Sequence, residues 1–232
     1  MDKEIFIEDN NQNSDQNFYQ KKIFRMFPYL QNKSKLMQLK IDQESTHFIS
    51  FRDHADKITQ IIKQHVKKIN CYCRDLIITD CTAGVGGNTL SFGHYFKFVN
   101  AIEIVKIRCQ YLQNNIDVYD LKNIKIFNED CTKILDKLEH NIIFVDAPWG
   151  LDYKKFKNLR LNFGNQQLEN FCIDLMNPNI MKKIPELIVL KLPKNYDVLY
   201  FYKIISSKNR QIYYYDLKKM IILVILIYDH QF

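Results

Sequence analysis

Three glycines lie within four positions of the stretch DCTAGVGGN, residues 80–88, in a chain that has only six glycines. Glycine lets a backbone approach a ligand that a Cβ atom would push away. The stretch separates a run that predicts a strand from one that predicts a helix, and the start of a helix offers free N–H groups. G-V-G-G matches neither the dinucleotide pattern G-x-G-x-x-G nor a phosphate loop with its Lys-Ser/Thr pair. The sequence therefore predicts a ligand-binding turn whose ligand need not be a pyrophosphate.

Two acidic residues, Glu103 and Asp130, end the next two predicted strands. A carboxylate about 20 residues after a glycine turn can accept hydrogen bonds from two ribose hydroxyls. A carboxylate at the end of the third strand is well placed to accept from an adenine amino group. Either acid alone could be an ordinary solvated residue at a strand end. Together with the glycine turn, they have the layout of an S-adenosylmethionine pocket.

The fourth predicted strand ends in VDAPWG, residues 145–150, which is similar to the [N/D/S]-P-P-[Y/F/W] motif of enzymes that methylate exocyclic amino nitrogens. Such a nitrogen is a poor nucleophile, because its lone pair is delocalised into the ring, so the enzyme must hold its N–H groups and keep the base flat. Asp146 and the carbonyl of Ala147 can accept from those N–H groups. Pro148 stiffens the loop, and Trp149 offers a face for stacking. The alternative is a core tryptophan packed under the loop.

A cationic base would gain most from stacking on this tryptophan, because cation–π contacts are worth on the order of 0.5–2 kcal/mol. The 7-methylguanine of an mRNA-type cap is such a base, and it keeps an exocyclic amine at N2.

The elements that must position these residues follow an alternation of hydrophobic runs. Strands are expected at 75–81, 98–104, 123–130, 141–148, 186–193, 211–219 and 220–228. Ser50 and Asp53 have the spacing of a capping box, which predicts that a helix begins there. Further helices are expected to begin at 89, to span 105–119 and 131–140, and to lie within 165–183. Alternating strands and helices predict a mostly parallel, doubly wound sheet. Two strands that meet at residues 218–219 predict a final antiparallel hairpin.

Charge and composition give broader limits. The formal net charge of +7 weakly favours a polyanionic partner such as RNA. The charged start MDKEIFIEDN is unlike a signal peptide, so we expect an intracellular protein of the nucleus or cytoplasm with reduced thiols. The run at 220–228 is far shorter than the ~20 residues of a membrane helix, which predicts no membrane segment. The pair Cys71 and Cys73 has no second pair at matching spacing, which predicts no metal.

Several stretches, in this order along the chain, resemble the trimethylguanosine synthase family, the RNA cap guanosine-N2 methyltransferases. They are DCTAGVGGNTLSF (80–92), DAPWGLDY (146–153) and LKLPKN (190–195), preceded by a basic and aromatic segment; the resemblance covers most of residues 18–232. It implies an α/β fold, the Rossmann-like class I methyltransferase, with a seven-stranded, mostly parallel sheet, a C-terminal antiparallel hairpin and a small N-terminal helical extension. We expect a disordered lead-in at 1–17, the extension at 18–52 and the methyltransferase domain at 53–232.

The implied activity is methyl transfer from S-adenosylmethionine to N2 of a 7-methylguanosine RNA cap. Independently of the resemblance, we expect a monomer. Residues implied to bind the cofactor are Asp80, Thr82, Ala83, Gly84, Gly86, Gly87, Asn88, Thr89, Glu103, Ile104, Asp130, Cys131 and Asp146. Implied catalytic residues are Asp146, Pro148 and Trp149, and implied cap-binding residues are Trp149, Lys194, Asn195, Lys40 and either Phe48 or Phe51. The two lysines would meet the cap phosphates as point charges, although each alone could be a solvated surface residue.

Two departures from the family concern the loop after the fourth strand: Ala147 replaces its first proline and Leu151 its second glycine. One alternative function is therefore methylation of another exocyclic amine, such as adenine N6, on DNA or RNA. A second is an inactive cap- or RNA-binding module. The LPKN stretch and the N-terminal extension favour the cap, and the intact acidic residues argue against an inactive module.

Overall fold

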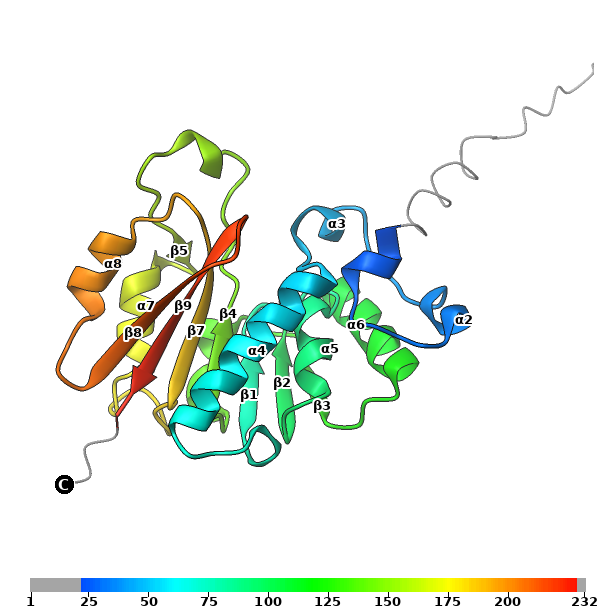
Figure 1. Cartoon of the computed structure of the whole chain (residues 1–232), viewed down its shortest axis with the longest axis horizontal. Helices are drawn as coiled ribbons and strands as arrows, with labels where there is room; N and C mark the ends of the chain where they lie inside the picture. The colour runs from blue at the N-terminus through cyan, green and yellow to red at the C-terminus, as the bar shows by residue number, and fades with distance from the viewer. Residues whose placement is uncertain (1–21, 229–232) are drawn as a thin grey trace, which may run out of the picture.

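The computed structural model describes residues 22–228, in which seven strands form one sheet in the order β3-β2-β1-β4-β7-β9-β8 (Figure 1). The strands are β1 Ile77–Asp80, β2 Phe98–Ile102, β3 Ile124–Phe127, β4 Ile142–Val145, β7 Leu187–Pro193, β8 Arg210–Asp216 and β9 Met220–Ile227. Strands β3, β2, β1, β4 and β7 are parallel, whereas β9 is antiparallel to both β7 and β8. The expected mostly parallel sheet with a C-terminal antiparallel hairpin is confirmed.

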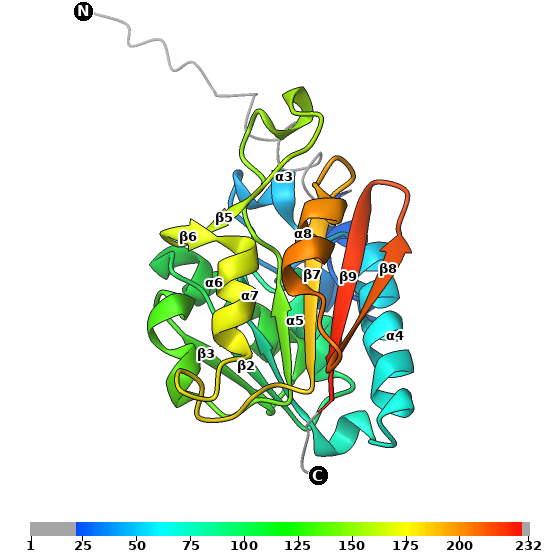
Figure 2. The same ribbon diagram turned by 90° about the vertical axis from the view of Figure 1, so that its left-hand side faces the viewer.

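Helices cover both faces of the sheet. On one face lie α4 Arg52–Lys68, α5 Gly87–Gly93 and α6 Lys106–Tyr119, and on the other α7 Leu168–Leu175 and α8 Val198–Ile205. Figure 2 shows α7 and α8 on the face opposite α4. Because both faces are covered, the central strands are apolar along almost their whole length, and every residue of β4 and β7 is buried.

Two local predictions were wrong. The stretch 131–140 forms two short 3-10 turns, η2 Cys131–Lys133 and η3 Leu135–Lys137, rather than a helix. The capping box at Ser50 does not form, because α4 begins at Arg52 with Phe51 as a cap that makes no side-chain bond. The Ser50 hydroxyl instead accepts a hydrogen bond from the Asn88 side chain (3.0 Å), so a tertiary contact replaces the local one. The structure also adds a small hairpin, β5 Asn162–Phe163 with β6 Gln166–Gln167.

The N-terminal segment packs beside α6 (Figure 1). It contains a helical turn at 22–26, α2 Lys33–Leu36 and α3 Ser45–Phe48. Its apolar residues Met26, Phe27, Leu36 and Leu39 are buried in one cluster with residues of α6. The lead-in expected at 1–17 lies outside the described residues.

Within residues 22–228, no helix is long and apolar enough to span a membrane. The same range holds no group of three or more His, Cys, Asp or Glu residues that could bind a metal ion.

Candidate active site at the carboxyl ends of the strands

The glycines of the turn after β1 serve two purposes. Gly84 has φ of 54°, in the left-handed region, and a Cβ atom added there would meet nothing within 4 Å. A Cβ at Gly87 would lie 2.8 Å from Ile49 Cγ1 and 2.9 Å from the Ser50 carbonyl oxygen. Gly84 therefore faces open space that a ligand can enter, whereas Gly87 lets the N-terminal segment pack closely on the turn.

Glu103 fixes this turn to the start of α6. It is 7% exposed, and its Oε2 accepts from the Gly84 N–H (2.9 Å) while Oε1 accepts from the Val105 N–H (2.8 Å). Each carboxylate oxygen has a second lone pair, so the side chain can still accept from a ligand hydroxyl. The expected ribose-binding acid is thus also a structural anchor of the pocket.

Asp80 and Asn88 supply buried polar groups beneath the turn. Asp80 accepts from the Thr89 hydroxyl (2.6 Å) and the Thr82 N–H (3.2 Å). Burial, reinforced by nearby carboxylates, raises the pKa of Asp80 to about 7, so a cationic ligand would favour its ionised form. The Oδ1 of Asn88 is buried and accepts no hydrogen bond from any described residue. An unpaired buried acceptor at the start of α5, directly after the glycine turn, fits a ligand with N–H groups.

The adenine end of the predicted pocket lies at β2 and β3. The apolar side chain of Ile104 is 66% exposed just after β2, and Cys131 is buried. Asp130 Oδ1 accepts from the Thr132 N–H (3.0 Å) and hydroxyl (2.8 Å). Its Oδ2 lies 4.0 Å from the exposed Lys133 ammonium, which leaves that oxygen available to a ligand amine. The described residues of the glycine turn and the two acids therefore fit an adenosyl group.

We expect Asp130→Ala to weaken S-adenosylmethionine binding by about 10- to 150-fold, since hydrogen bonds to charged groups contribute about 1.5–3 kcal/mol. Asp130→Asn is the matched control, because its carbonyl oxygen can still accept from Thr132. Titration calorimetry with the cofactor measures both variants. An unchanged affinity in Asp130→Ala would remove Asp130 from the cofactor site.

The loop after β4 carries an ion pair that the sequence analysis missed. Lys191 Nζ lies 2.5 Å from Asp146 Oδ2, and the two side chains are 5% and 17% exposed. Burial raises the pKa of Asp146, and the ammonium of Lys191 opposes that rise. The Asp146 N–H also donates to the Thr82 hydroxyl (3.1 Å), which couples the ends of β4 and β1. The signal was present in the sequence, since Lys191 is the only charged residue within the apolar run LIVLKLP.

Trp149 packs against the core and lies near this ion pair. It is partly buried against the cluster that includes α7 and α8, and its ring centroid is 5.1 Å from that of Tyr153, edge to face. Lys191 Nζ lies 5.5 Å from the Trp149 centroid. The indole Nε1 of Trp149 is buried and has no hydrogen-bond partner among the described residues. Pro148, the residue before Trp149, is exposed. The structure thus brings Trp149, Asp146 and Lys191 together and leaves stacking on Trp149 as a prediction.

The remaining cap-side residues differ in their surroundings. Lys194 is paired with Asp216 at the surface. The Lys40 side chain is exposed, and Phe48 is 46% exposed with the Arg108 guanidinium 4.9 Å from its ring centroid. Phe51 is partly buried among apolar residues. Their contacts with a cap stay predictions, and greater exposure favours Phe48 over Phe51.

Asn195 holds the loop that follows Trp149. Its Nδ2 donates to the carbonyls of Tyr153 and Phe156, both at 2.7 Å. We expect Asn195→Ala to lower the free energy of unfolding by about 1–3 kcal/mol, as two hydrogen bonds of about 0.5–1.5 kcal/mol are lost, and to raise KM for the methyl acceptor. Asn195→Asp, which lacks the donors, should be at least as harmful. Thermal melts and acceptor KM measure both; wild-type values would mean that this anchor is dispensable.

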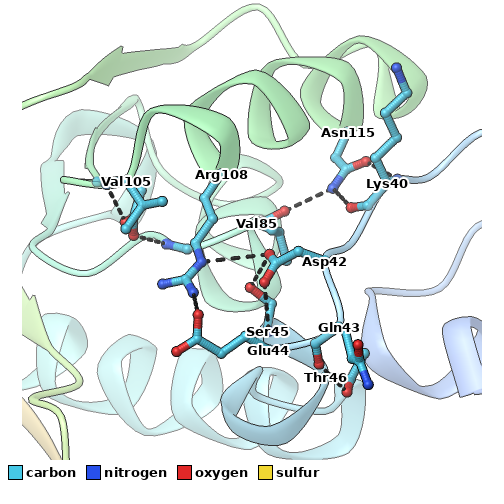
Figure 3. Close-up of polar contacts among 12 residues, drawn as sticks. Lys40, Asp42, Gln43, Glu44, Ser45, Thr46, Val85, Val105, Arg108 and Asn115 are labelled. Atoms are coloured by element: carbon cyan, nitrogen blue, oxygen red, sulfur yellow. Dashed lines mark hydrogen bonds and ion pairs between the residues drawn. The ribbon is translucent and has the colours of Figure 1, made fainter.

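A second network closes the N-terminal segment over α6. Arg108 Nη2 lies 2.5 Å from Glu44 Oε2, and Nε lies 3.5 Å from Asp42 Oδ2 (Figure 3). Asn115 donates to the carbonyls of Lys40 and Val85, both at 2.9 Å. Residues 40–46 are therefore held beside the turn that Glu103 supports. Arg108 and Asn115 both lie on the helix expected at 105–119. No local sequence pattern indicates that they bind residues 40–46, which are more than 60 positions earlier in the chain.

Together the sheet order, the glycine turn, and the acids that end β1 to β4 define a class I methyltransferase, whose cofactor is S-adenosylmethionine. Comparison with known proteins gives the family. Residues 75–228 match the family model described as RNA cap guanine-N2 methyltransferase, and the chain belongs to that family. The expected family and fold class are thereby confirmed.

The chain is also similar to one uncharacterized viral protein and, in fold alone, to solved methyltransferase structures. An uncharacterized protein of Acanthamoeba polyphaga mimivirus is 38% identical over 220 residues, covering 86% of this chain and 83% of that protein. A precorrin-6y C5,15-methyltransferase from Geobacter metallireducens shares the fold with a TM-score of 0.55 at 11% identity, over 83% of this chain and 95% of that one. The 16S rRNA N2 methyltransferase RsmC from T. thermophilus, solved in complex with AdoMet and guanosine, shares it with a TM-score of 0.56 at 13% identity, over 82% of this chain and 44% of that one.

Proposed function

We propose that the protein methylates the exocyclic N2 of a 7-methylguanosine RNA cap. The observation that carries the proposal is the partly buried Asp146 carboxylate, held by Lys191 at the end of β4 and followed three residues later by the partly buried Trp149. The family description supports guanine N2 as the target. RsmC, which shares the fold, is a 16S rRNA N2 methyltransferase.

The chain's own residues orient the acceptor. Bound S-adenosylmethionine supplies a methyl group on a sulfonium, which is already a good leaving group, so the protein mainly positions and desolvates. Asp146 Oδ2 bonds Lys191, which leaves Oδ1 to accept from an N2–H and direct the nitrogen lone pair away from the carboxylate. Asp146 can also take the proton that the amine loses. Trp149 would hold the ring flat by stacking.

Acceptor choice tests the proposal. Labelled S-adenosylmethionine is incubated with capped RNA, the same RNA with an unmethylated guanosine cap, and an uncapped RNA rich in adenine. We expect label only in the 7-methylguanosine-capped RNA. Label in adenine would favour the N6 alternative, and cap binding without transfer would favour an inactive module.

We further propose that the protein works as an intracellular monomer, in the nucleus or cytoplasm.

A further inference from the structure

The loop at residues 150–160, GLDYKKFKNLR, follows directly after Trp149 and is rich in cations. It contains Lys154, Lys155, Lys157 and Arg160 but only one acid, Asp152. Figure 2 shows the loop standing above the carboxyl ends of the strands. Its charge is therefore concentrated on the same side of the molecule as the active site.

The loop is anchored to the end of β7 at two places. Asn195 donates to the carbonyls of Tyr153 and Phe156, and its own carbonyl accepts from the Leu159 N–H (2.8 Å). The Asp197 N–H donates to the Leu159 carbonyl (2.8 Å). A loop tied in this way presents its side chains in a defined arrangement, which lowers the entropy cost of binding a ligand.

Three of the four cations have no acidic partner among the described residues, and two of these three also lack the ring stacking that engages Arg160. Lys155 pairs with Asp152 (2.7 Å), and the Arg160 guanidinium stacks 3.7 Å from the Tyr200 centroid. Lys154 and Lys157 are exposed and form no ion pair in the described part of the chain. Their ammonium groups are therefore available to an anionic partner.

The same loop also carries exposed apolar side chains. Leu151 is fully exposed, and Phe156 is 54% exposed. Tyr153 links the loop to the active site, because it contacts Trp149 edge to face and has Lys154 Nζ 5.7 Å from its ring centroid. Alternating cations and exposed aromatic faces are the means by which proteins bind single-stranded nucleic acid without reading its sequence.

We infer that the loop at 150–160 binds the single-stranded RNA that follows the cap, with Lys154 and Lys157 on phosphates and Phe156 stacked on a base. The inference rests on the proposed function for the direction in which the RNA leaves Trp149. It makes the RNA chain, and not the cap alone, part of the recognised substrate.

Fluorescence anisotropy with a capped 15-nucleotide single-stranded RNA tests the inference. Because each phosphate contact contributes about 0.7 to the salt slope for single strands, K154A/K157A should bind about 20-fold more weakly at 0.1 M salt, with a slope about 1.4 smaller. Phe156→Leu should lose at least about fivefold through stacking. The matched control K67A/K97A removes two exposed lysines far from the loop, at the other end of the sheet, and should stay within about twofold of wild type.

Binding of 7-methyl-GTP should be unchanged in the loop variants. Equal losses in K154A/K157A and K67A/K97A, or no loss in either, would overturn the inference, and an effect on 7-methyl-GTP would mean that the loop binds the cap instead. Methyl transfer to 7-methyl-GTP by the wild-type protein tests the proposed function separately. If that transfer fails while RNA affinity still depends on the loop, the proposed function falls and the RNA-binding loop stands.

Discussion

Lys191→Met is expected to lower methyl transfer most at the acidic end of the pH range and to regain it as the pH rises. Burial raises the pKa of Asp146, and the Lys191 ammonium opposes that rise. Without the ammonium, the pKa of Asp146 rises further, so the carboxyl group stays protonated up to a higher pH and cannot take the proton that the target amine loses. The ionised form returns only as the pH rises through the new pKa. Since an opposite charge lowers a carboxyl pKa by about 1–3 units, the acidic limb of the kcat/KM profile should move up by that amount.

The pH profile separates positioning from a purely structural role. Lys191→Arg keeps the positive charge and should restore the limb in part, and Lys97→Met is the control for losing an exposed lysine. Asp80, with its pKa of about 7, titrates in the same pocket and feels the charge of Asp146, so a shift of the limb between variants reports on these two carboxyl groups together. A uniformly lower rate with an unmoved limb would show that Lys191 only supports the fold.

Trp149→Ala is expected to keep cofactor binding and to lose 7-methyl-GTP binding by about 5- to 150-fold, since stacking of a base on an aromatic ring contributes about 1–3 kcal/mol. Titration calorimetry with each ligand measures the two affinities separately. Trp149→Phe is the matched variant, because it keeps an aromatic face and most of the packing.

The partial burial of Trp149 makes the control necessary. Its ring packs against the core and contacts Tyr153, so truncation to alanine also removes packing. If both affinities fall together in Trp149→Ala, and Trp149→Phe restores both equally, Trp149 acts as a core residue. A loss confined to 7-methyl-GTP supports stacking.

The cofactor side of the site was the more predictable half. Glu103 and Asp130 end strands that hydrophobic runs identify, and the carboxyl ends of parallel strands meet at one edge of a sheet. Order along the chain therefore predicted that Glu103 lies near Gly84, as its hydrogen bond to the Gly84 N–H shows, whereas the role of Asp130 in the pocket stays a prediction. The sequence could not show that Glu103 bonds two backbone N–H groups, because those bonds depend on the turn geometry.

Contacts between distant segments were less predictable. Ser50 resembles a helix cap in sequence but contacts Asn88, and Arg108 binds Asp42 and Glu44 across more than 60 residues. Asn195, expected on the cap, donates both amide hydrogens to a loop 39 and 42 residues earlier. No periodic pattern encodes such partners, since they arise only when the elements pack.

The position of the new methyl group on 7-methyl-GTP tests the central claim most directly. The protein is incubated with labelled S-adenosylmethionine and 7-methyl-GTP, with GTP alongside, and the nucleoside is analysed by mass and fragmentation. We predict label on N2 of 7-methylguanosine and none on GTP. Label at another atom, equal label on GTP, or cofactor binding with no label would contradict the assignment of Asp146 and Trp149 to the cap guanine.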